Sequence, residues 1–96
     1  MTVETRPFDA ARYLDSDEGI AAFMDEAFQT GDPAFITHAL GTVARARGMT
    51  QIARDAGVSR ESLYRALGNR GNPEFATVLR VMEALGLRLG AEVKAA

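Results

Sequence analysis

The chain has 96 residues, 47% hydrophobic and 25% charged, so it can form one small domain but cannot also enclose a roomy substrate cleft. It has no cysteine, which excludes disulfides and thiolate metal sites, and neither a bilayer-length apolar run nor a secretory leader, so the cytoplasm is its expected location. The net charge of −2 is divided unevenly, since residues 1–44 hold eight acids against two arginines and residues 45–96 hold nine bases against five acids.

The N-terminal part of the chain predicts an extended arm followed by a helix. Residues 1–14 show no helical or strand period, and we expect them to form the arm. Ser16 is followed by two acids, which suit the first turn of a helix because they oppose the helix dipole. Apolar residues then recur every three or four positions from Ile20 to Phe28, which predicts a helix over about 17–29.

A second helix follows a glycine-containing turn. Asp32 is expected to be its N-cap and Pro33 its first residue, because proline has no amide hydrogen to lose at that position. The same apolar spacing continues to about Arg47, and Gly48 ends the helix. His38 lies beside this stripe and is expected to be an ordinary surface or boundary histidine.

The next residues predict two short helices joined by a tight turn. Thr50 is expected to cap the first, which ends at Ala56 because Gly57 suits the left-handed conformation that follows a helix. Ser59 has the oxygen that an N-cap needs, and apolar residues at helical spacing predict a second helix over about Arg60–Leu67.

The second short helix turns a mixed set of donors and acceptors away from its apolar side. Such a set can contact base edges in a DNA groove, and the candidates for base readout are Ser59, Arg60, Glu61, Ser62, Tyr64 and Arg65. Between Arg45 and Arg70 there are six arginines against two acids, a local field that attracts phosphate. The candidates for phosphate contact are Arg45, Arg47, Thr50, Gln51, Asn69 and Arg70. On charge alone, a merely solvated basic face remains the alternative.

The C-terminal part predicts one more helix and a strand. Pro73 is expected to open the helix and Gly86 to end it, with an apolar stripe formed by Phe75, Val78, Leu79, Met82 and Leu85. The phenylalanines Phe23, Phe28, Phe35 and Phe75 are expected in the core.

Apolar and polar residues then alternate over 87–93, which predicts a short strand. A strand without a partner in its own chain is a candidate contact for a second copy, and its apolar side is Leu87, Leu89, Ala91 and Val93. The arm around residues 8–14 is the second candidate for the dimer contact.

Two stretches resemble known families. The segment Met49–Gly68, MTQIARDAGVSRESLYRALG, resembles the helix-turn-helix of phage-repressor and Cro-type regulators, the Xre superfamily. The longer run Gly48–Leu89 resembles the addiction-module antidote proteins, which are HigA-like antitoxins. This resemblance implies an all-α, lambda-repressor-like helix-turn-helix domain. With the elements predicted above, the expected fold is five helices over 15–96, with the motif at 50–67, an N-terminal extended arm and a short C-terminal strand.

The resemblance also implies a function. We expect an antitoxin of a type II toxin-antitoxin system that neutralises a RelE/HigB-like toxin and represses its own operon as a homodimer. Its DNA partner would be a double-stranded operator with an inverted repeat, because one short recognition helix reads only a few base pairs. The alternatives are a free-standing Xre-type transcriptional regulator and an interaction module that does not bind DNA.

An enzyme is not expected. The chain offers one histidine, no cysteine and no converging pair of carboxylates near a glycine-rich loop, so no catalytic constellation, metal site or cofactor is predicted. The residues Gly68–Asn72, GNRGN, lack the lysine of a nucleotide-binding loop, so we expect their glycines to serve a turn.

Overall fold

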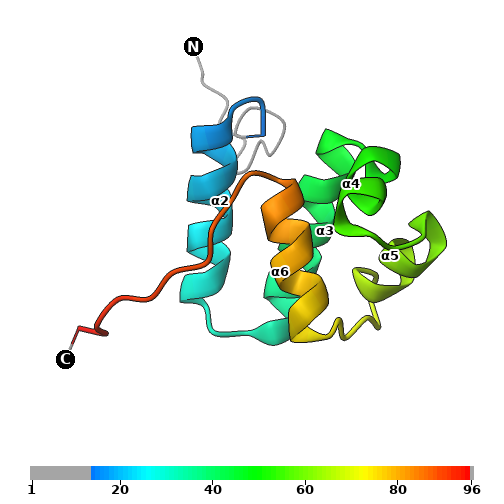
Figure 1. The fold of residues 1–96 in the computed structure, drawn as a ribbon. Helices are drawn as coiled ribbons and strands as arrows, with labels where there is room; N and C mark the ends of the chain where they lie inside the picture. The colour runs from blue at the N-terminus through cyan, green and yellow to red at the C-terminus, as the bar shows by residue number, and fades with distance from the viewer. Residues whose placement is uncertain (1–13, 96) are drawn as a thin grey trace, which may run out of the picture.

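The structure, a computed structural model, describes residues 14–95, and this part of the chain contains five helices (Figure 1). They are α2 (Asp17–Gln29), α3 (Pro33–Arg47), α4 (Met49–Ala56), α5 (Arg60–Ala66) and α6 (Phe75–Ala84). The all-α prediction is therefore confirmed for the described residues. Of the expected N-terminal arm, only Leu14 lies inside this range, and its side chain is buried in the core.

The first two helices begin as their sequences predict. The Ser16 hydroxyl accepts a hydrogen bond from the Gly19 amide at 2.9 Å, and the Asp32 carboxylate accepts one from the Ala34 amide at 3.0 Å. Each bond satisfies an amide that has no partner inside its helix, which is why such caps stabilise helices by about 1 kcal/mol. Pro33 is the first residue of α3.

The prediction that Thr50 caps α4 is wrong. The helix begins one residue earlier, at Met49, and Gly48 takes the N-cap position, its carbonyl accepting from the Ile52 amide at 3.0 Å. Because burial of the Met49 side chain is favourable, Met49 becomes the first residue of α4. Thr50 is then exposed on the outer side of the first turn. One glycine thus both ends α3 and starts α4.

The start and the apolar stripe of α6 also differ from the prediction. The helix begins at Phe75, because Glu74 is extended (φ −65°, ψ 152°) and Pro73 lies outside the helix. Val81 is fully buried with Met82 and Leu85, whereas Phe75 and Leu79 are 65% and 40% exposed. The buried face of α6 is therefore centred on Val81. Phe75 and Leu79, which were expected in the core, lie at the edge of this face.

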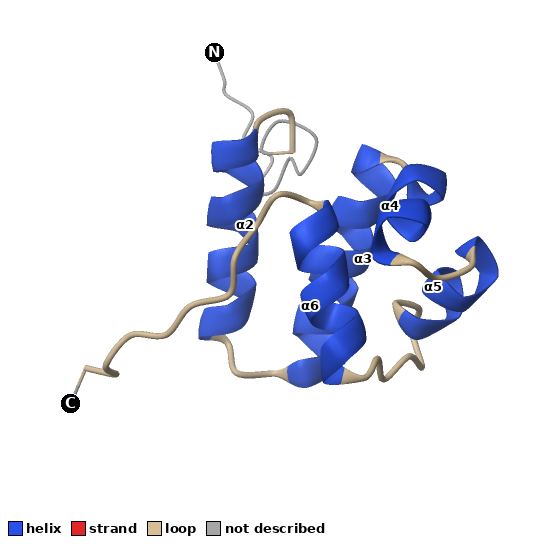
Figure 2. Ribbon diagram, viewed as in Figure 1, coloured by secondary structure: helices blue, strands red, loops and turns tan. Residues whose placement is uncertain are grey.

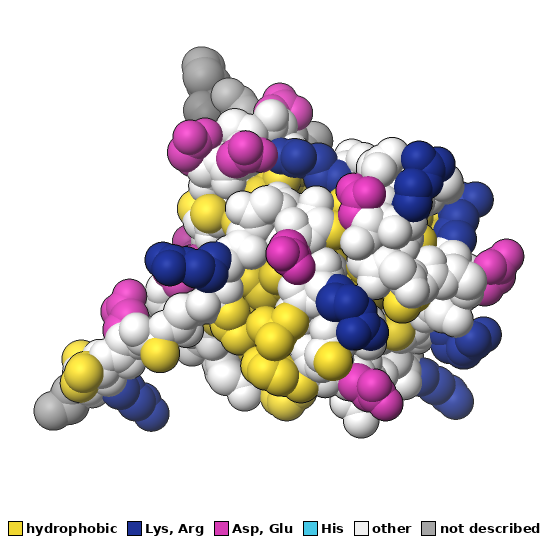
Figure 3. All heavy atoms as spheres, viewed as in Figure 1, with side chains coloured by type: hydrophobic (Ala, Val, Ile, Leu, Met, Phe, Trp, Pro, Cys, Tyr) yellow, Lys and Arg dark blue, Asp and Glu magenta, His cyan; other side chains and the backbone are white. Residues whose placement is uncertain are grey.

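The expected phenylalanine core is only partly present. Phe23 and Phe28 are partly buried against the core, but Phe35, like Phe75, is exposed, with 49% of its surface accessible. In the space-filling view, hydrophobic side chains emerge on the surface over the N-terminal half of α6 (Figure 3). The core itself is aliphatic and is centred on Ile20, Met24, Leu40, Val43, Leu63 and Val81.

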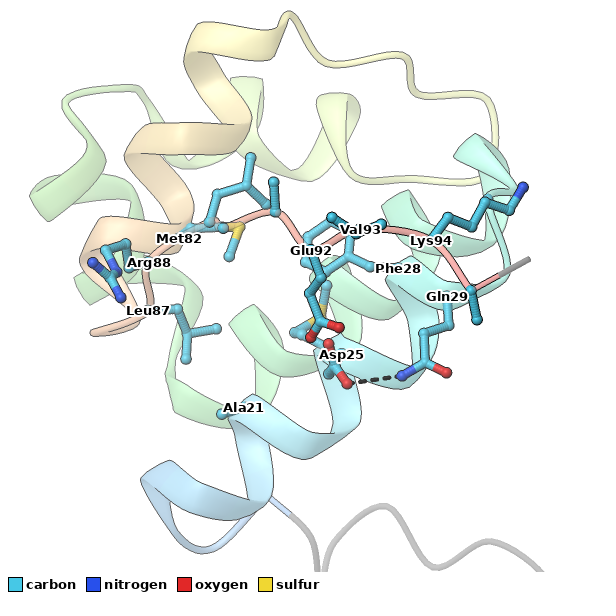
Figure 4. A pocket seen from close by; sticks show the side chains of 16 residues that line it. Ala21, Asp25, Phe28, Gln29, Met82, Leu87, Arg88, Glu92, Val93 and Lys94 are labelled. Atoms are coloured by element: carbon cyan, nitrogen blue, oxygen red, sulfur yellow. Dashed lines mark hydrogen bonds between the residues drawn. The ribbon is translucent and has the colours of Figure 1, made fainter.

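The predicted C-terminal strand is wrong, since residues 87–95 form an extended chain without strand pairing (Figure 2). A strand requires a neighbouring strand to complete its hydrogen bonds, and no described segment provides one. The tail instead runs beside α2, where Leu87 and Leu89 pack on the core as half-buried residues. Tail and α2 together line an open groove, with Phe28 and Met82 among its walls (Figure 4).

The helices form three groups. α2 lies at one side with the tail across it, α3 and α6 occupy the middle, and α4 and α5 form the opposite side (Figure 1). α4 packs most extensively on α6, and also contacts α3 and α5. The pair α4 and α5 is thus supported from behind and presents its outer faces away from α2.

Gly71 fits tightly beneath the end of α5. A Cβ atom on Gly71 would lie 1.9 Å from the Ala66 carbonyl oxygen, closer than any side chain can approach, so the loop must shift if the residue is not glycine. The loop is also closed on itself, because the Gly71 amide donates to the Gly68 carbonyl at 2.9 Å. The position of residues 68–71 relative to α5 therefore depends on this glycine.

We predict that Gly71→Ala lowers the free energy of unfolding by about 1–3 kcal/mol, the usual cost of forcing atoms into a filled space. Gly90→Ala is the matched control, because a Cβ there would meet nothing within 4 Å and its effect should stay within about 0.5 kcal/mol. Urea unfolding followed by circular dichroism measures both. If the two variants were equally stable, the loop would not be held against α5.

Candidate nucleic-acid interface

The turn between α4 and α5 places the two helices in a defined relative position. Gly57 has a left-handed backbone (φ 76°), and the Val58 amide then donates back to the Ala53 carbonyl at 3.0 Å. Ser59 caps α5, its hydroxyl accepting from the Ser62 amide at 3.0 Å. The predicted end of α4 and the predicted cap of α5 are both confirmed, and three residues make the whole connection.

α5 is attached by its inner face. Leu63 is fully buried and Leu67, just past the helix end, is 2% exposed. Four predicted readout residues are exposed on the outer face, namely Arg60, Glu61, Tyr64 and Arg65. Ser62 is half-buried, and Ser59 is exposed with its hydroxyl occupied as the cap acceptor. The structure therefore places the six residues on or beside one helix, and confirms the expected exposure of Tyr64.

Arg60 and Tyr64 form a pair on this outer face. The Arg60 guanidinium carbon lies 5.3 Å from the centre of the Tyr64 ring, and Nη2 of Arg60 donates to the tyrosine oxygen at 3.4 Å. A cation held over an aromatic ring gains about 0.5–1 kcal/mol at an exposed site. The two residues are four apart, the spacing at which helical side chains meet, so this contact could have been found from the sequence.

The side chains on α3 and α4 that are predicted to contact phosphate differ in whether they already have a partner. Arg47 is already paired, since its Nη2 donates to the Asp17 carboxylate at 2.6 Å. Gln51 donates to the Asp55 carboxylate at 2.9 Å. Thr50 and Arg45 are exposed, although Nη1 of Arg45 folds back over Gly41, 3.2 Å from where a Cβ would stand. The charge of Arg47 is thus partly neutralised, and one donor of Gln51 is occupied within α4.

The loop after α5 contributes two more exposed side chains. Asn69 and Arg70 lie in the turn that Gly71 holds under the end of α5, and Arg70 has no ion-pair partner among the described residues. Its backbone is therefore held near the C-terminal end of α5, and its charge is not neutralised within this part of the chain.

The sequence prediction missed Arg54, which is exposed in the last turn of α4 and is one of the six arginines between Arg45 and Arg70. The arginine cluster itself was the signal for it. In the space-filling view, basic side chains gather over α4 and α5, while acidic side chains gather at the N-terminal end of α2 (Figure 3). The division of charge along the sequence is therefore also a division in space.

The four expected dimer-contact residues are not equally available. Leu87 and Leu89 are half-buried against their own chain, whereas Ala91 is exposed and Val93 is 96% exposed. The described residues contain no cluster of three or more histidine, aspartate or glutamate side chains that could hold a metal ion. Within the same range, no helix is long and apolar enough to span a membrane.

Comparison with known proteins finds a family and a relative. The family model described as "Probable addiction module antidote protein" matches residues 4–93. A protein of Haemophilus influenzae that is described only as uncharacterized is 52% identical over 88 residues, which are 92% of this chain and 91% of that protein. No solved structure gives a significant match.

Proposed function

The chain belongs to the addiction module antidote protein family, and we propose that it is a DNA-binding antitoxin that represses its own operon. Membership in an antidote family implies a toxin partner of some kind and favours a regulatory rather than an enzymatic role. The observation that supports DNA binding most directly is the surface of α5, where Arg60, Tyr64 and Arg65 are exposed together while Leu63 is buried.

In this proposal α4 and α5 are a helix-turn-helix, and α5 enters the major groove. The groove is wide enough for one helix, and arginine is the side chain that most often recognises guanine there, through two parallel hydrogen bonds. Arg65 is exposed and has no carboxylate partner among the described residues, so its donors are free for such a contact. The exposed residues that flank α5 would bind phosphates and set its register on the duplex.

The toxin in this proposal is a small RelE/HigB-like protein encoded beside the antitoxin. Such a gene, overlapping or adjacent, is the observation that separates an antitoxin from a free-standing Xre-type regulator. If the neighbouring genes encode no such protein, the regulator is the better interpretation and the DNA-binding part of the proposal is unaffected.

A homodimer is the proposed DNA-binding form, with the exposed end of the tail at the contact between copies. One α5 has only seven residues and can read only a few base pairs, whereas two copies one helical turn of DNA apart would read an inverted repeat. Val93 exposes an apolar side chain almost completely, and a second copy could cover it. A toxin could compete for the same surface.

We predict that Arg65→Ala weakens binding to the chain's own upstream DNA by about 1–3 kcal/mol, the value of one bidentate base contact, and affects random DNA less. Gel-shift titrations with the two DNAs measure the difference. Gln29→Ala is the control, because Gln29 is exposed on α2, on the opposite side of the fold from α4 and α5 (Figure 1). An equal loss on both DNAs would make Arg65 a phosphate contact, and no loss on either would remove it from the interface.

We predict different salt dependences for Arg70→Gln and Arg47→Gln. Removing Arg70, which has no ion-pair partner among the described residues, should make the slope of log K against log salt shallower by about 0.9, since one fewer counterion is released. Removing Arg47 should change the slope less, because Asp17 already neutralises it. Fluorescence anisotropy at several salt concentrations gives both slopes, and an unchanged slope for Arg70→Gln would show that the loop points away from DNA.

We predict that deleting residues 90–96 raises the dimer dissociation constant about tenfold or more, because burying one valine contributes roughly 1.5 kcal/mol. This deletion keeps Leu87 and Leu89, which pack on the core, so the fold should be retained. Analytical ultracentrifugation measures the constant, and Lys94→Ala is the control in the same segment. A dimer of unchanged strength after the deletion would exclude the tail as the contact.

A further inference from the structure

The contact between Arg60 and Tyr64 has three properties that separate it from an ordinary surface pair. The guanidinium lies over the aromatic ring at 5.3 Å, and a hydrogen bond from Nη2 to the tyrosine oxygen at 3.4 Å fixes its orientation as well. Both side chains are exposed, with 42% of the Tyr64 surface accessible. They also lie on one flank of the exposed surface of α5, with Arg60 as the first residue of the helix and Tyr64 one turn later.

Arg60 is held without losing its charge. Among the described residues it forms no ion pair, whereas Arg47 is neutralised by Asp17. The nearby acids are placed differently, because Asp55 accepts from Gln51, and Glu61, next in sequence, points about 100° away around the helix. A carboxylate partner would have held Arg60 equally well but would have competed with any acceptor on DNA. A tyrosine ring holds the cation and leaves its charge available.

Most of the donors of Arg60 also remain available. A guanidinium carries five N–H groups, and the hydrogen bond to Tyr64 uses one of them. The remaining four include enough donors in one plane for the O6 and N7 acceptors of a guanine, the pattern that arginine reads in the major groove. The ring therefore restricts where the guanidinium lies without blocking the edge that would face a base.

We infer that Arg60 reads a guanine and that Tyr64 is its positioning residue rather than a reader of DNA. This inference rests on the proposed DNA-binding function. An arginine that is free in solution loses rotamer freedom when it binds, and this loss weakens the complex. Contact with Tyr64 already restricts Arg60 to a conformation close to the one that would bind a base. Less rotamer freedom is therefore lost when the complex forms. The contribution of Tyr64 should therefore disappear when Arg60 is absent.

The test is a double-mutant cycle on operator binding with Arg60→Ala, Tyr64→Leu and the combined variant, supported by Tyr64→Phe. Tyr64→Leu should weaken operator binding about two- to fivefold, the strength of an exposed cation–ring contact, and Tyr64→Phe should restore most of it because the ring remains. In the Arg60→Ala background, Tyr64→Leu should have no further effect. Phe35→Leu removes a similarly exposed ring from another helix, α3, and is the matched control.

The guanine is located with operators that carry 7-deazaguanine, which lacks the N7 acceptor, at one position at a time. One substitution should weaken the binding of the unmodified protein but leave the binding of Arg60→Ala unchanged. Random DNA should show no coupling between the two residues, and thermal unfolding of every variant reports whether α5 remains folded. A pair that only stabilised α5 would change the unfolding and both DNAs alike, which would overturn the inference.

The remaining outcomes are also decisive. If Tyr64→Leu weakens operator binding equally with and without Arg60, Tyr64 contacts DNA itself and the inference is wrong. If no 7-deazaguanine position depends on Arg60, this arginine does not read a guanine. If the unmodified protein binds neither its own upstream DNA nor random DNA, the proposed function fails instead, and that result is distinguishable because it needs no variant.

Discussion

The burial of Leu63 is the constraint on which the rest of the structure depends. α5 has seven residues, too few to be stable as an isolated helix in water, so it exists because its inner face is packed. Leu63 is fully buried and Leu67 nearly so, and together they orient every other residue of α5. With that face buried, helical spacing puts Arg65 on the opposite side of α5, and Arg60 and Tyr64 are exposed on its flank.

Local signals in the sequence predicted most of the helix ends. Asp32 and Ser59 were identified as caps because each supplies an oxygen to an amide two or three residues ahead, a contact that depends on no other part of the chain. The errors arose where tertiary packing decided the result. Met49 is drawn into α4 because its side chain is buried, and no local pattern separates that outcome from a cap at Thr50.

The strand was predicted from an alternation of apolar and polar residues, which by itself is not enough to form a strand. Alternating residues at 87–93 give a chain with two different sides, yet only a neighbouring strand could convert it into a sheet. For α6, the spacing of apolar residues allowed two inward directions, one through Leu79 and one through Val81. Packing against α4 selected Val81, which is fully buried, so Phe75 and Leu79 remain at the surface.

The contacts between neighbouring residues of the candidate interface could be predicted from the sequence, but the contacts between different helices could not. The contacts of Arg60 with Tyr64 and of Gln51 with Asp55 span four residues each and follow from helical spacing alone. The contact of Arg47 with Asp17 spans thirty residues and requires the packing of α2 against α3. It withdraws one arginine from the basic face, so the available charge is concentrated closer to α5 than the sequence indicates.

Gly71 connects the stability of the fold to the geometry of the proposed interface. Because a side chain at this position would strike the Ala66 carbonyl, the turn that carries Asn69 and Arg70 can lie close under α5 only with glycine there. Phosphate contacts fix the register in which a helix meets the bases, so they are useful only at a constant distance from the residues that read. The tight fit at Gly71 therefore keeps the proposed phosphate contacts of the loop at a set distance from the proposed readout residues of α5.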